Sequence, residues 1–409
     1  MKKIAFFSLA EACAALTARL APLAPEQIPL SNALGRISAV AIHAQYPSPS
    51  FDQSTRDGFA LASQPLFVDH RVAVFQISGE SAAGCLEYKA LQLGQAIRIM
   101  TGAAVPSHCA RVVPCEVCQE QADKVLVPLA ELTSQPLHIR CQGQEIQAGQ
   151  LLLAAGTRLL PEHLLWLAEN GTQDIAVHRQ PRVAVLCTGS ELIKAGAVLQ
   201  HGQKISGNGI LLAALLQAEN CLCVCTALVE DNAERSAALM QQIIQQHQPD
   251  LLISTGGMGP GKFDLTEQVF SLLGGEPLCN RLHVRPGKAT LVGLLGKVPF
   301  FGLPGPPPAV RLLFHELVAP ALRSLHGEIV GNDGLVSAVL DCPLTGCQHD
   351  TDDLVLKGGI AWLDAAGCLR VRPAKTLQPI NAILHLSGYE DKSVHVRLLG
   401  SESTALRHN

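Results

Sequence analysis

The sequence predicts a protein of several domains in which a doubly wound α/β domain is combined with β-rich parts. Strands and helices alternate between residues 181 and 327, a pattern typical of a mainly parallel sheet with helices on both faces. Short apolar runs broken by Gly, Pro and Ser fill residues 28–140 and return after residue 327. The 409 residues are 48% hydrophobic and 16% charged, which excludes a disordered chain and allows several cores.

The first residues imitate a secretory signal peptide, with two lysines before a short apolar run. Glu11 interrupts that run, and Ser8 and Glu11 have the spacing of a capping box at the start of an amphipathic helix. We therefore predict that residues 1–25 form one structural helix. A second helix is expected between Pro161 and Gly171. No run of 18 apolar residues is present, so no membrane span is predicted.

The α/β part divides into nine expected elements by its hydrophobic pattern. Strands are expected at residues 182–189, 221–229, 250–254, 282–287 and 298–305, and helices at residues 209–220, 233–248, 265–273 and 307–325.

Charge and cysteine content limit the possible functions. The net charge is −4, so non-specific binding of nucleic acid is not expected. Cys221, Cys223 and Cys225 alternate and should lie on one face of a strand. Cys115 and Cys118 form an isolated CxxC without the second ligand pair that a zinc site needs. The cysteines therefore indicate reduced thiols that pack in the protein, and a cytoplasmic location.

Three expected strand ends carry glycine- or proline-rich loops, "TGSEL" from residue 188, "TGGMGPGKFD" from 255 and "PGPPPAV" from 304. Ligands of open α/β sheets bind beyond the carboxyl ends of the strands, where free backbone N–H groups and helix N-termini attract anions. Lys262, Arg285 and Lys288 could add positive charge, and Glu191 and Asp264 could hold a metal ion. Each loop alone could equally be a turn.

The second loop nearly matches the P-loop pattern G-x-x-x-x-G-K-[ST] of nucleotide-hydrolysing proteins. Gly256, Gly261 and Lys262 fit, but Phe263 stands where the pattern requires a hydroxyl group for Mg²⁺. A P-loop NTPase is therefore the weakest of the functions considered.

The motifs taken in order resemble the molybdopterin molybdenumtransferase family, known as MoeA in bacteria and as the E domain of gephyrin in animals. The similarity extends over residues 8–325. Its landmarks are "SFDQSTRDGFA", "RIMTGAAVP", "GQEIQAGQLLLAAGTRL", "VAVLCTGSEL", "LLISTGGMGPGKFDLT", "HVRPGKAT" and "FGLPGPPPAV".

The resemblance implies four domains and an elongated homodimer. It assigns residues 1–26 and 146–180 to a linking domain, 27–145 to a β-rich domain, 181–327 to the α/β molybdopterin-binding domain and 328–409 to a C-terminal β-barrel. The site would lie between the α/β domain of one subunit and the β-rich domain of the other.

The implied reaction belongs to molybdenum cofactor biosynthesis: molybdate is inserted into adenylylated molybdopterin, AMP is released, and Mg²⁺ or a similar divalent cation is required. By the same resemblance, Asp57, Glu191 and Asp264 are catalytic, and Glu191, Asp264 and Glu145 bind the metal. The implied partners are a molybdopterin adenylyltransferase and molybdoenzyme acceptors. The implied substrate-binding residues are Thr101, Ser190, Gly256, Gly257, Gly259, Lys262, Arg285, Lys288, Pro304 and Pro307.

Several positions depart from the family pattern. Ser190 replaces an Asp or Asn, Pro260 removes a backbone donor from the glycine-rich loop, and Pro306 replaces an Asn amide. The C-terminal part also lacks the expected Arg-rich and Ser-containing loops. These changes leave an alternative open, a molybdopterin-binding or carrier paralogue that is non-catalytic or has a different specificity, for example for tungstate.

Overall fold

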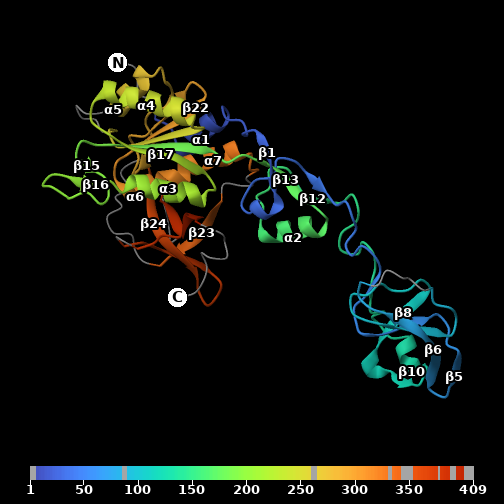
Figure 1. Cartoon of the computed structure of the whole chain (residues 1–409). Coiled ribbons are helices and arrows are strands. Elements are labelled where there is room, and N and C mark those ends of the chain that lie inside the picture. The colour runs from blue at the N-terminus through green and yellow to red at the C-terminus, as the bar shows by residue number, and fades with distance from the viewer. Residues whose placement is uncertain are drawn as a thin grey trace.

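The structure is a computed structural model, and it describes residues 6–84, 90–258, 265–329, 334–341, 353–375, 378–386 and 393–399. Figure 1 shows an elongated chain in which an α/β domain and a barrel lie at one end and a β-rich domain at the other. A smaller linking unit connects the two ends. Among the described residues, no helix is both long enough and apolar enough to cross a bilayer.

The α/β domain is built on a six-stranded sheet, which confirms the predicted fold class. The first four strands are parallel, and β21 is antiparallel to both of its neighbours. The order across the sheet is β17 (Leu222–Val229), β14 (Arg182–Thr188), β18 (Leu251–Thr255), β22 (Val298–Leu303), β21 (Leu291–Leu295) and β19 (Glu276–Cys279).

Helices cover both faces of this sheet because its central strands are apolar on both sides. Phe300 and Phe301 on β22 are fully buried and belong to the cores on opposite faces. α4 (Ala233–His247) and α5 (Leu265–Leu272) cover one face. The other is covered by α1 (Leu9–Thr17), α3 (Asn208–Ala218), α6 (Pro307–Leu313), the π-helical turn η4 (Phe314–Val318) and α7 (Ala319–His326).

One strand prediction for this domain was wrong. The strand expected at residues 282–287 is only β20 (Val284–Arg285), and it pairs with β24 of the barrel instead of joining the sheet. The sheet contains β19 and β21 instead, which were not predicted. The helix expected at residues 307–325 is confirmed as one continuous helical segment, which contains a π-helical turn between α6 and α7.

The first helix is shorter than predicted. It begins with the expected capping box of Ser8 and Glu11 but ends at Thr17. Pro22 and Pro25 follow, and β1 (Pro25–Pro29) is extended, because proline disfavours helix both at its own position and before it. α1 buries Leu9 against the α/β domain, so it packs there and not with the linking unit to which residues 1–26 were assigned.

The linking unit is held together by strands that are distant in sequence. β1 pairs with β13 (Asp174–His178), and β2 (Ile42–His43) pairs with β12 (Leu151–Leu153). α2 (Pro161–Glu169) begins at its proline as expected and covers these strands. Residues 25–43 therefore pack with this unit, although residues 27–145 were predicted as the β-rich domain.

The β-rich domain contains a seven-stranded sheet, short 3-10 turns and a two-stranded connection. The sheet strands are β4 (Gly58–Ala62), β5 (Phe67–Asp69), β6 (Val72–Ser81), β7 (Gln95–Ile99), β8 (Cys109–Pro114), β9 (Gln119–Gln121) and β10 (Lys124–Pro128). The 3-10 turns are η2 (Cys115–Val117) and η3 (Leu129–Leu132), and η1 (Leu30–Asn32) belongs to the linking unit. β3 (Gln53–Ser54) pairs with β11 (Ile139–Arg140), and the Ser54 N–H also donates to the Ala103 carbonyl oxygen of the β-rich domain at 2.9 Å.

The C-terminal part is a closed barrel, as predicted. β24 pairs with both β25 and β26, which closes the ring of five strands. The strands are β23 (Leu335–Leu340), β24 (Leu354–Leu363), β25 (Leu369–Pro373), β26 (Ala382–Leu386) and β27 (Ser393–Leu398).

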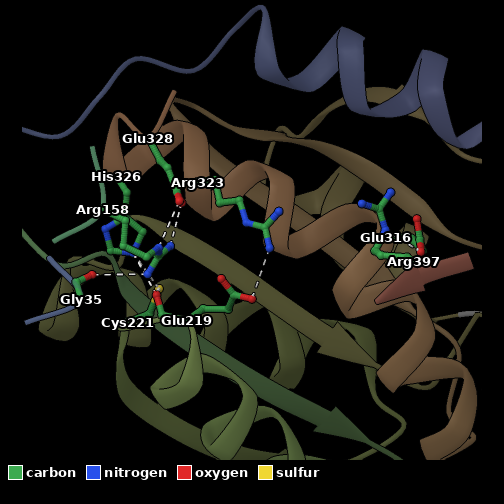
Figure 2. A network of polar contacts seen from close by, with 9 residues as sticks. All are labelled: Gly35, Arg158, Glu219, Cys221, Glu316, Arg323, His326, Glu328 and Arg397. Carbon is green, nitrogen blue, oxygen red and sulfur yellow. Dashed lines mark hydrogen bonds and ion pairs between the residues drawn. The ribbon is translucent and has the colours of Figure 1, made fainter. Parts of the chain in front are cut away.

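Buried polar contacts fasten the α/β domain to its neighbours (Figure 2). Arg158 of the linking unit forms two hydrogen bonds with Glu328, at 3.0 and 2.7 Å, and a third with the Gly35 carbonyl oxygen. On the barrel side, the buried Glu316 accepts a hydrogen bond from Arg397 at 2.9 Å. Burial lowers the pKa of His326, beside Glu219, to about 4, so this imidazole is neutral at pH 7.

The three alternating cysteines do not share one face of β17, contrary to the prediction. The register against β14 shifts between Cys223 and Cys225, which a β-bulge explains. Cys221 and Cys223 pack against the core of one face, and Cys225 packs against the core of the other. A one-residue slip reverses the direction of every following side chain.

Gly58 offers a test of the packing of the β-rich domain. A Cβ atom at Gly58 would lie 2.0 Å from the Val113 carbonyl oxygen of the neighbouring strand. We expect Gly58→Ala to destabilise this domain by about 1–3 kcal/mol or more. Gly79→Ala on β6 is the matched control, because nothing lies within 4 Å of its Cβ position. Urea unfolding, monitored through amide hydrogen exchange of β4 and β8, measures the difference in the free energy of unfolding between the two variants. Equal stability of the two variants would contradict this packing.

Candidate functional site

The carboxyl ends of the four parallel strands surround a cavity of about 730 Å³. Its wall comes from the loops that follow β14, β17, β18 and β22 and from the start of α3. This is the edge at which the three predicted loops were expected to meet. Five predicted site residues lie on the wall: Glu191, Gly256, Gly257, Pro304 and Pro307.

Gly256 shapes the floor of the cavity. Its φ is +89°, and a Cβ atom would lie 2.4 Å from the Thr188 carbonyl oxygen, so glycine is required. The Gly256 N–H donates to the Leu303 carbonyl oxygen at 3.0 Å, and its own carbonyl oxygen accepts from Thr266 Oγ1 at 2.9 Å. Both backbone groups are thus used within the protein, and this N–H does not serve the cavity.

The proline-rich loop also differs from an anion cradle. Pro306, Pro307 and Pro308 have no N–H groups, so the start of α6 lacks three of the donors that a helix N-terminus usually offers. The loop is held by Asn208, whose Nδ2 donates to the Gly305 carbonyl oxygen at 2.8 Å and to Thr255 Oγ1 at 3.3 Å. Asn208 therefore connects three loops of the cavity wall.

Two carboxylates stand on the wall, Glu191 after β14 and Asp231 after β17. The Ser190 N–H donates to Asp231 Oδ2 at 2.9 Å, and the Asp231 N–H donates to Ser190 Oγ at 3.3 Å. Ser190 thus holds Asp231 in place. The sequence interpretation missed Asp231, although it follows a predicted strand almost directly, and the strand-end rule could have identified it.

An arm of two short strands projects from the α/β domain (Figure 1), and residues of this arm line part of the cavity. It consists of β15 (Leu192–Ile193) paired with β16 (Lys204–Ile205). The Lys204 N–H donates to the Glu191 carbonyl oxygen at 2.8 Å. Among the described residues, Lys204 is the one basic side chain on the wall. No motif in the sequence pointed to Lys204 or Asn208.

Arg285 and Lys288 do not line the cavity. Arg285 Nε lies 3.0 Å and Lys288 Nζ 3.7 Å from Asp353 Oδ2, and His283 contacts the other oxygen at 3.1 Å. Burial alone would raise the pKa of Asp353, but the hydrogen bonds from His283 and Arg285 outweigh it and lower the pKa. Both predicted anion-binding cations are therefore directed to a carboxylate of this chain.

Asp57 and Thr101 lie together in the β-rich domain, which is at the opposite end of the molecule from the α/β domain (Figure 1). The Thr101 N–H and hydroxyl donate to Asp57 Oδ1 at 2.7 and 3.0 Å, and these bonds lower the pKa of Asp57. Asp57 lines a second cavity of about 360 Å³ with Arg98 and Glu120.

The remaining predicted residues are at neither cavity or cannot be placed. Glu145 forms an ion pair with Arg140 at 3.2 Å, beside the two-stranded connection. Gly259, Lys262 and Asp264 lie outside the described residues. Within the described part of the chain, no group of three or more His, Cys, Asp or Glu side chains could hold a metal ion.

Comparisons with known proteins agree with this architecture. A profile described as the MoeA N-terminal region, domains I and II, matches residues 7–171, and one described as a probable molybdopterin binding domain matches residues 184–324. A molybdopterin molybdenumtransferase of Staphylococcus epidermidis is 33% identical over 316 residues, covering 76% of this chain and 74% of its own. The chain belongs to the molybdopterin molybdenumtransferase family. Members of this family are transferases of molybdenum cofactor biosynthesis.

Further relatives support the same membership. The molybdopterin molybdenumtransferase of Haemophilus influenzae is 32% identical over 308 residues, which covers 75% of this chain and 74% of that protein. The crystal structure of a molybdopterin biosynthesis MoeA protein from Pyrococcus horikoshii superposes with a TM-score of 0.78 at 25% identity. The superposition covers 97% of this chain and 100% of the Pyrococcus horikoshii chain, so the whole four-part architecture is typical of the family.

The contact between Asp57 and Thr101 predicts a titration. Thr101→Val removes the hydroxyl donor and keeps the backbone donor, so the pKa of Asp57 should rise part of the way toward its ordinary value. Since the folded pKa is the lower one, the stabilisation by ionised Asp57 is present at neutral pH and is lost as the pH falls through that value. In the variant it should be lost at a higher pH.

NMR titration of the Asp57 carboxyl carbon measures this shift. Thr101→Ser keeps a hydroxyl group and is the control that should titrate like the wild type. Identical titration of Thr101→Val and the wild type would show that the hydroxyl bond does not hold the carboxylate.

Proposed function

We propose that this chain inserts molybdate into adenylylated molybdopterin and releases AMP. The observation that carries the proposal is the cavity at the carboxyl edge of the α/β sheet, with Glu191 and Asp231 on one wall. Membership of the molybdopterin molybdenumtransferase family supplies the substrate class. The cytoplasm suits this role, because the cysteines of the described residues are free thiols.

The two carboxylates are suited to a divalent cation. Mg²⁺ takes oxygen ligands and is often bound by one or two carboxylates together with substrate phosphates. Glu191 and Asp231 would hold it, and Asp264 is a further candidate beyond the described residues. When bound, the cation neutralises negative charge that develops as the phosphoanhydride breaks. Ser190 orients Asp231 through its backbone N–H. Glu145 is not part of this proposed set.

The active form we propose is a homodimer in which each site is shared. Asp57 and Thr101 form a prepared carboxylate site in the β-rich domain, but the linking unit separates that domain from the cavity of the same chain (Figure 1). A second copy can bring its β-rich domain to the cavity, as closed two-fold symmetry provides two equivalent sites. Asp57 would then complete the site from the other subunit.

A carrier that binds molybdopterin without turnover is the second candidate. The proline-rich loop favours it, because Pro306, Pro307 and Pro308 cannot donate hydrogen bonds to an oxyanion. A tungstate-specific enzyme is a variant of the first candidate, and the same assay separates all three.

Turnover of the purified protein is the first test. With adenylylated molybdopterin, Mg²⁺ and either molybdate or tungstate, the wild type should release AMP and place metal on the pterin. Glu191→Gln should lower kcat by about 100-fold or more, as expected of a group that contributes several kcal/mol. Glu234→Gln on α4 is the matched control, because Glu234 is not on the cavity wall. Pterin binding without AMP release would replace the transferase by the carrier.

Mixing two inactive variants tests the shared site. If Asp57 acts in the other subunit, a heterodimer of Asp57→Asn and Glu191→Gln chains has one intact site and one doubly altered site. Random reassortment should then restore about a quarter of the wild-type activity. Activity that stays at the level of the separate variants, while mass spectrometry detects the mixed dimer, would place Asp57 and Glu191 in the same subunit's site or Asp57 outside it.

A further inference from the structure

The predicted residues do not explain how the cavity could bind an anion. Both substrates of the proposed reaction are anions, but the described wall carries two carboxylates, Glu191 and Asp231. A bound anion needs nearby positive charge or backbone donors to offset the cost of its desolvation and its repulsion by the two carboxylates. Lys204 is the one cation on the wall among the described residues.

Within the described part of the chain, several expected sources of anion binding are already paired or lack a donor. The Gly256 N–H is bonded to Leu303, and the prolines at the start of α6 have no N–H. Arg285 and Lys288 contact the buried Asp353, so much of their charge is neutralised within this chain. Lys204 and the start of α3, at Gly207 and Asn208, also line the cavity.

The first turn of α3 presents backbone donors at this part of the cavity. Gly207 occupies the N-cap position, where no side chain caps the helix, and the intrahelical bonds begin with the Leu211 N–H to the Gly207 carbonyl oxygen. Gly207 and Asn208 both line the cavity. The N–H groups of a first turn and the helix dipole together favour an anion.

Asn208 gives an independent indication that a ligand completes this place. It is only 8% exposed, and its Nδ2 is fixed by Gly305 and Thr255. Its Oδ1 is buried and has no hydrogen-bond partner within the described part of the chain. Buried acceptors are nearly always paired in folded proteins, so an unpaired one on a cavity wall points to a donor group of a ligand or a water molecule bound with it.

We propose that Lys204 and the first turn of α3 bind a tetrahedral oxyanion of the substrate, either a phosphate group of the adenylylated pterin or molybdate itself. This inference rests on the proposed function and identifies an anion-binding end within that cavity. Asn208 positions this anion-binding part of the cavity, because it fixes the start of α3 against the proline-rich loop. The Lys204 side chain lies on a short two-stranded arm and is exposed, so it can follow the anion as it enters.

Steady-state kinetics of the full-length protein test the proposal. Lys204→Ala should raise one KM by about tenfold, the loss expected for one charge-assisted contact, and Lys204→Arg should restore most of it. A rise confined to the pterin substrate identifies phosphate as the anion, and a rise confined to molybdate identifies molybdate. Either effect should shrink at high ionic strength.

Lys194→Ala is the matched control, because Lys194 lies on the same arm but not on the cavity wall. Lys262→Ala tests the competing glycine-rich loop. The proposal is overturned if Lys204→Ala behaves like Lys194→Ala, and a loss seen with Lys262→Ala alone would assign the anion to that loop.

Calorimetric titration with inorganic pyrophosphate separates this proposal from the proposed reaction, since it requires no turnover. If the wild type binds pyrophosphate and Lys204→Ala binds it about tenfold more weakly, the anion site stands even where no AMP is released. If the wild type turns over but Lys204→Ala is unchanged in both KM values and in pyrophosphate affinity, the reaction stands and the anion site is wrong.

Discussion

The parallel pairing of β14 with β17 and β18, and of β18 with β22, determines where every group of the cavity lies. Parallel strands end at the same edge, so four loops that are far apart in the sequence meet there. The strands can pair in this way because their residues are apolar on both sides and both faces are covered by helices. Glu191 and Asp231 both line the cavity for this reason.

Close backbone contacts then fix the floor of the cavity. Gly256 can approach the Thr188 carbonyl oxygen only because it has no Cβ atom, and this contact brings the loops after β14 and β18 together. The same packing uses the Gly256 N–H for Leu303. A glycine-rich loop after a strand is therefore not by itself an anion cradle: here Gly256 supports the wall, and its N–H is already bonded within the protein.

Local patterns predicted the elements of the α/β domain well, because each strand and helix carries its own periodicity. They could not predict which distant segments pair, and so residues 27–43 were assigned to the β-rich domain instead of the linking unit, and β20 was assigned to the wrong sheet. The strand-end rule predicted the position of the cavity and five of its residues. It could not predict that Arg285 and Lys288 meet Asp353, or that Asn208 and Lys204 face the cavity, because these contacts depend on the packing of separate elements.

The chain passes from the linking unit into the β-rich domain and returns through two adjacent segments, which form a stalk. A bridge between Ser48 and Ile146 and the pairing of β3 with β11 join these two segments. Geometrically this stalk is a lever, because a small rotation at its base moves the whole β-rich domain at its other end (Figure 1). Under the proposed shared site, a substitution in the stalk would alter catalysis without touching a reacting group. The stiffness of this two-stranded stalk would then influence the rate of the reaction as well as the shape of the molecule.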